Sequence, residues 1–145
     1  MTPGGALQAA IARLTAAGLV QARSPLGVVK ASSQRVNRSF SVLPSTLGPA
    51  SKPDRGRPNL SGLRVAQVFT VALGHQIKPG DGQEAPTTAL ADLHTAWKSL
   101  SEFGNTLSDG AAIQIGSASM SYEGGGAFMV TTFPLTVTYN LDLTP

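Results

Sequence analysis

The last third of the chain carries an alternating pattern that predicts two long β-strands. In residues 127–143 apolar side chains recur at every second position, with Thr, Asn and Asp between them. Residues 111–122 predict a partner strand, and the glycine-rich residues 123–126 predict a hairpin turn between the two. Phe128 falls on the other parity, so this apolar side chain would lie on the opposite face of the strand from those that begin at Phe133. Because proline cannot donate to a ladder, we expect a bulge or an edge position near Pro134.

Two stretches have the apolar spacing of amphipathic helices. Residues 6–17 are alanine-rich, and Gly18 is well placed to end that helix. A second helix is predicted to begin near residues 86–88, where a threonine would serve as N-cap. Its predicted apolar stripe consists of Leu90, Leu93, Trp97 and Leu100.

Two further strands are predicted at residues 38–43 and 63–77. The second strand carries Gln67 and His75 on the same parity as its apolar residues. Between the two strands, residues 44–62 are rich in proline and glycine, which predicts a loop longer than most compact domains contain. This predicted loop also carries the basic residues Lys52, Arg55 and Arg57.

The order of these elements predicts one α+β domain over residues 1–145. Four strands would form a mainly antiparallel sheet, because the last two strands make a hairpin and the others have room to reverse direction. The two helices would then pack on one face of that sheet. The length of 145 residues is enough for a single hydrophobic core.

Charge is distributed very unevenly along the chain. Residues 1–78 carry ten Lys and Arg against one Asp (+9), and residues 79–145 carry one Lys against seven acids (−6), which together give +3. Such asymmetry is compatible with nucleic-acid contact, with complementary faces that associate with neighbours, or with halves that interleave and cancel. Charged residues make up only 13% of the chain, about half the usual share. We therefore expect part of the surface to be covered by neighbours.

The sequence contains little that indicates catalysis. There is no cysteine, which excludes disulfides and thiolate chemistry, and the two histidines, His75 and His94, lack a metal-ligand spacing. No G-x-S-x-G elbow is present. The glycines at 124–126 join strand to strand, whereas a phosphate-binding loop leads from a strand into a helix. We therefore expect no catalytic, cofactor or metal site and no enzyme activity.

The predicted loop at residues 44–62 has three possible roles. Its basic residues can form a solvated surface, contact an acidic protein neighbour, or bind nucleic acid. Proteins that bind single-stranded nucleic acid interleave aromatic residues with such charges, and this loop has no aromatic residue. No apolar run is long enough to cross a membrane, so we expect no membrane partner.

In element order and pattern the chain resembles the tail terminator proteins of long-tailed bacteriophages. The resemblance rests on the N-terminal helix, the strand at residues 64–77 that runs into a Pro/Gly turn, the following helix at residues 90–103, and the closing hairpin. The stretches QVFTVAL at residues 67–73 and FPLTVTYNL at residues 133–141 are similar to that family's strands. The resemblance covers most of the chain outside residues 44–62.

The resemblance implies a structural protein of the virion, assembled in the host cytoplasm and placed at the neck of the tail. Copies of such a protein form a ring, expected to be a hexamer, that caps the head-proximal end of the tail tube. The ring docks to the head-completion or connector proteins, and genomic DNA only passes through its lumen. The alternatives are another head–tail joining or tail-tube protein, a basic nucleic-acid-binding module, and, with no supporting motif, a small enzyme.

Two contact surfaces follow as hypotheses. Lys52, Arg55 and Arg57 are expected to make a polar contact with a neighbouring ring. The C-terminal strand is expected to form the subunit interface within the ring, since exposed strand edges pair readily. The interface residues expected on that strand are Phe133, Leu135, Val137, Tyr139 and Leu141.

Overall fold

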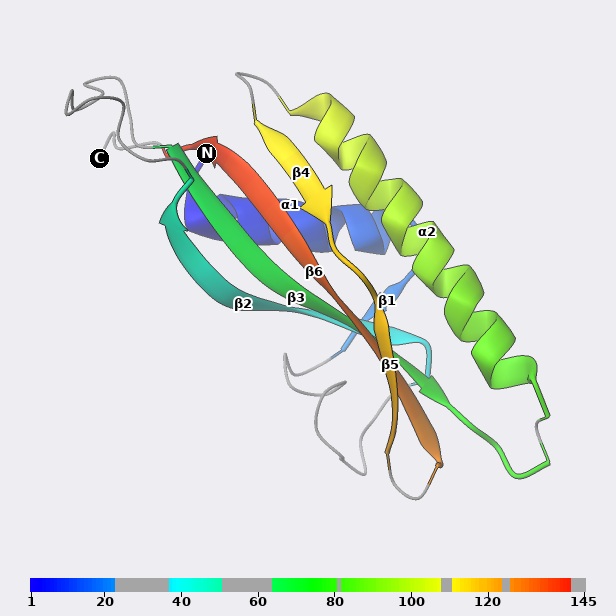
Figure 1. Cartoon of the computed structure of the whole chain (residues 1–145). Helices are drawn as coiled ribbons and strands as arrows, with labels where there is room; N and C mark the ends of the chain where they lie inside the picture. The colour runs from blue at the N-terminus through cyan, green and yellow to red at the C-terminus, as the bar shows by residue number, and fades with distance from the viewer. Residues whose placement is uncertain (23–36, 51–63, 81, 108–110, 124–125, 142–145) are drawn as a thin grey trace.

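The computed structural model describes residues 1–22, 37–50, 64–80, 82–107, 111–123 and 126–141. These residues form two helices and six strands (Figure 1). In chain order the elements are α1 (Pro3–Ala16), β1 (Val20–Gln21), β2 (Ser39–Pro49), β3 (Arg64–Gln76), α2 (Glu84–Thr106), β4 (Ala112–Ile115), β5 (Ser119–Glu123) and β6 (Phe128–Asn140).

The predicted α+β class is confirmed, but the sheet has six strands rather than four. The strands are ordered β1-β2-β3-β6, and both β4 and β5 pair with the remaining edge of β6. Only β1 and β2 run parallel; the other pairs are antiparallel. The sequence pattern missed β1 because two residues are too short to show alternation, and it predicted β4 and β5 as one strand.

The break between β4 and β5 is the irregularity predicted near Pro134. It lies in the partner strand, because three residues at 116–118 stand opposite two residues of β6, while β6 pairs with β3 in one continuous register. The Gly116 N–H donates to the Pro134 carbonyl at 2.9 Å. An added Cβ at Gly116 would lie 2.4 Å from Cγ of Pro134, so only glycine fits there. β6 thus accommodates a proline without lying at an edge of the sheet.

Helix α1 begins and ends with regular caps. The Thr2 hydroxyl accepts a hydrogen bond from the Gly5 N–H at 3.0 Å. At the other end Gly18 has a φ of 95°, and the Leu19 N–H donates to the Leu14 carbonyl at 3.2 Å. This is a Schellman arrangement, for which glycine is favoured because its φ is positive. The predicted role of Gly18 is confirmed.

Helix α2 differs from its prediction at its start. It begins at Glu84, and the capping residue Gln83 makes no side-chain cap bond, so the predicted threonine N-cap is wrong. Leu90 is 53% exposed, so this member of the predicted apolar stripe faces solvent, whereas Ala85, Ala89 and Ala96 are buried and allow a close approach to the sheet. The buried residues of α2 are Ala85, Ala89, Asp92, Leu93, Ala96, Leu100 and Phe103.

Strand β2 extends further than the sequence indicated. Residues 44–49 belong to this strand and pair with β3, so the first part of the predicted loop at 44–62 is wrong. Two prolines suggested a loop, but β2 tolerates them because it has a register shift after Pro44 and its outer edge is open there among the described residues. Lys52, Arg55 and Arg57 lie outside the described residues.

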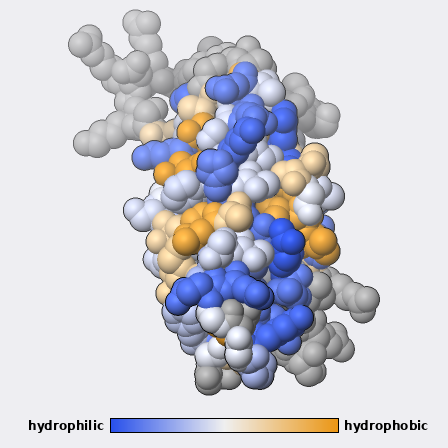
Figure 2. All heavy atoms as spheres, turned by 90° about the vertical axis from the view of Figure 1, so that its right-hand side faces the viewer, coloured by the Kyte–Doolittle hydropathy of each residue, from blue (hydrophilic) through white to orange (hydrophobic). Residues whose placement is uncertain are grey.

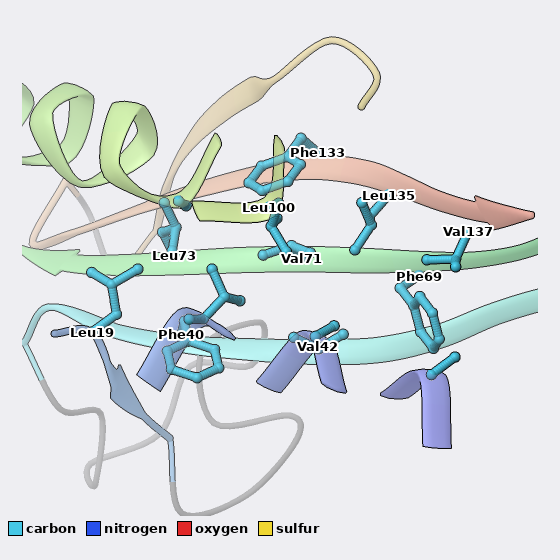
Figure 3. Packing of buried hydrophobic residues seen from close by; sticks show 14 of the residues in the cluster. Leu19, Phe40, Val42, Phe69, Val71, Leu73, Leu100, Phe133, Leu135 and Val137 are labelled. Carbon is cyan, nitrogen blue, oxygen red and sulfur yellow. The ribbon is translucent and has the colours of Figure 1, made fainter. Parts of the chain in front are cut away.

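Both helices pack on the same face of the sheet, where the core forms (Figures 1 and 3). The odd-numbered residues of β3, from Val65 to His75, all face this core. Among the described residues, the opposite face carries a second, smaller cluster formed by Ala72, Phe128 and Val130, against which Ala22 packs. The opposite apolar phase of Phe128 and Val130 therefore reflects a strand buried on both faces, without a change of register.

Candidate subunit interface and buried polar cluster

The C-terminal strand supplies the core and not an exposed surface. Phe133, Leu135, Val137 and Tyr139 are each at most 1% exposed, and Leu141 packs against the same core. β6 is also paired on both edges, with β3 on one side and β4 and β5 on the other. Side chains already covered in the single chain add little area to a subunit contact. The side chains expected to form the subunit interface are therefore covered within the single chain.

The sheet order separates the two oppositely charged parts of the chain. β1, β2 and β3 come from the basic part, and β6, β4 and β5 from the acidic part, so the strands of the two parts do not interleave. Helix α1 packs over β1 and β2, while α2 packs over β3, β4 and β6. The strands of the two parts therefore lie at different ends of the sheet, which we call the basic end and the acidic end after the part of the sequence that supplies them. Six of the ten basic residues of the first part lie outside the described residues, and Arg38 is paired with Asp92 of α2.

At the basic end the open edge of β2 has lost two of its backbone donors. The Ala22 N–H donates to the Phe40 carbonyl, which shows that Phe40 faces outward, and with the alternation of a strand Pro44 does too. Beyond the register shift the Ala50 N–H donates to Arg64 on β3, so Pro49 also faces outward. Proline on an outer edge discourages strand addition.

At the acidic end the edge of β5 has no such protection. The Pro134 carbonyl faces β4 and β5, so the even-numbered residues of β6 hydrogen-bond to that side. Ser121 is paired with Val130, and its backbone groups face β6. The backbone N–H and C=O of its neighbours Met120 and Tyr122 therefore point away from the sheet. Their side chains are 40% and 60% exposed.

The α2 side of the molecule is mostly polar. In the view onto this side, hydrophobic groups occur in small clusters separated by hydrophilic ones (Figure 2). A stable interface needs a continuous well-packed centre, which this side does not show. The sheet edges are the better candidates for contact between copies.

A second candidate site is a buried polar cluster that joins three elements. Asp92 on α2 is 4% exposed and accepts two hydrogen bonds from Arg38, from Nη2 at 2.9 Å and Nε at 3.2 Å. His75 on β3 lies with Nε2 2.7 Å from Asp92 Oδ2. Arg38, in the turn before β2, has a φ of 58°, a conformation that few residues other than glycine adopt. The backbone turn thus directs a cation onto a buried carboxylate.

The neighbours of Asp92 stabilise its ionised form. Burial raises the pKa of Asp92, but the hydrogen bonds and charges of Arg38 and His75 outweigh burial, so this pKa lies below its ordinary value. The hydrogen bond and charge of Asp92 in turn raise the pKa of Arg38. The cluster therefore holds a charged carboxylate in the core at neutral pH.

The cluster is arranged to hold α2, β3 and the turn before β2 together, and we call it the clamp. A histidine that serves as a catalytic base contacts a nucleophile with one ring nitrogen and an orienting group with the other. Nδ1 of His75 is buried without a hydrogen-bond partner, so no described hydroxyl is positioned to be activated. A hollow of about 180 Å³ adjoins the cluster and is lined by Arg38, Lys78, Glu84 and Thr88, among others. Its two cations are offset by Glu84 and Asp92, so the hollow does not favour one charge.

A second buried network fixes the start of α1 to the sheet. The Tyr139 hydroxyl donates to Gln67 Oε1 at 2.7 Å, and Gln67 Nε2 donates to the Pro3 carbonyl at 3.3 Å. Gln67 and His75 are the two polar residues that the sequence places on the apolar parity of β3, and both have polar partners in the core. The sequence analysis did not identify Arg38 and Asp92. The only indication of them was that Gln67 and His75, as polar residues on a buried face, require hydrogen-bond partners.

Two classes of site are absent from the part of the chain that the structure describes. It contains no group of three or more His, Asp or Glu side chains that could hold a metal ion. None of its helices is long and apolar enough to cross a membrane. Trp97, a member of the predicted apolar stripe of the second helix, packs edge-on against Phe133 with ring centroids 6.0 Å apart.

Comparisons with known proteins add no assignment. No protein-family model matches the sequence, and no curated protein is significantly similar to it.

Proposed function

We propose that the chain is the tail terminator of a long-tailed bacteriophage, a structural protein that forms a ring at the head-proximal end of the tail tube. The observation that carries this proposal is the open six-stranded sheet, whose outer edge at β5 is regular while the edge at β2 carries outward-facing prolines and a register shift. The α+β architecture, with both helices on one face, agrees with the resemblance of the sequence to that family.

The proposed ring requires a head-to-tail contact, which joins different surfaces of neighbouring copies. Such a contact forms a ring when the rotation closes, whereas a two-fold interface joins the same surface of each copy. Six copies are the number that the resemblance implies.

The proposed partners are the tail-tube protein below the ring and the head-completion or connector protein above it. Lys52, Arg55 and Arg57 remain the proposed polar contact with a neighbouring ring. Replacing Arg55 and Arg57 with Glu would reverse the charge of that contact, and we expect the variant to lose attachment to tails while its own oligomeric state is unchanged. Normal attachment of this variant to tails would contradict the proposed contact between these basic residues and a neighbouring ring.

The same sheet ends also fit a tail-tube or head–tail joining protein, because those proteins also stack in rings. The test is to mix the purified chain with growing tail tubes and to image the products by electron microscopy. A terminator appears as one ring at a single tube end and stops elongation, whereas a tube subunit is incorporated along the length. Binding to DNA alone, with steep loss on added salt, would instead support the nucleic-acid-binding alternative.

A further inference from the structure

We draw no further inference here: the strongest candidate, the edge of strand β5 that faces away from β6 beside the exposed side chains of Met120 and Tyr122, carries none because nothing in the structure shows what covers it.

Discussion

Removal of the Asp92 carboxylate provides the sharpest test of the clamp between α2, β3 and the turn before β2. Asp92→Ala leaves His75, whose side chain is 2% exposed, without its one hydrogen-bond partner. A buried polar group that loses its partner costs about 1–3 kcal/mol. Arg38 is 58% exposed, so water replaces the carboxylate there and its share is at most about 1 kcal/mol. The expected loss of stability is therefore about 1–4 kcal/mol.

Urea unfolding followed by the fluorescence of Trp97, the single tryptophan, measures this loss directly. The same loss corresponds to a fall in Tm of about 3–15 °C for a chain of this size. Arg38→Ala is the control, because it removes the exposed partner only and is expected to cost no more than about 1 kcal/mol. The reasoning is refuted if Asp92→Ala lowers the unfolding free energy by less than about 0.5 kcal/mol, the range of an ordinary surface substitution.

Three further predictions follow from the same contacts. The pKa of Asp92 is lowered in the fold, so its ionised form stabilises the chain above about pH 4. This stabilisation is lost as the pH falls through the pKa of Asp92 in the folded chain. Asp92→Asn should therefore make the free energy of unfolding depend less on pH in the acid range. Gly116→Ala places a methyl group against Pro134 and should cost about 1–3 kcal/mol in a denaturant titration, whereas an unchanged midpoint would contradict the packing at this break. Tyr139→Phe leaves Gln67 without its donor and should cost about 1–2 kcal/mol, measured in the same way; no loss would show that the network is not satisfied as described.

Much of the fold was predictable because alternation and helical spacing are local signals. β3, β6, both helices and the role of Gly18 follow from such patterns. The number of strands did not, since β1 is too short for a pattern and the break at Gly116 depends on a proline in another strand. Pro44 and Pro49 suggested a loop because their tolerance depends on the edge position of β2, which is a property of the whole sheet.

The candidate interface shows the same limit. Strict alternation at Phe133, Leu135 and Val137 establishes that one face of β6 is buried but does not tell whether its own chain or another copy covers it. The structure shows that its own helices do. Which backbone groups of β5 point outward depends on the register with β6, and no pattern within β5 itself carries that information.

The central proposal is that copies of this chain assemble into a closed ring. The most direct measurement is the mass of the purified protein by native mass spectrometry over a range of concentrations, with electron microscopy of the same samples. The proposal predicts closed six-fold rings with an open centre. A two-fold dimer, or a chain that stays monomeric both alone and with tail tubes, would contradict it.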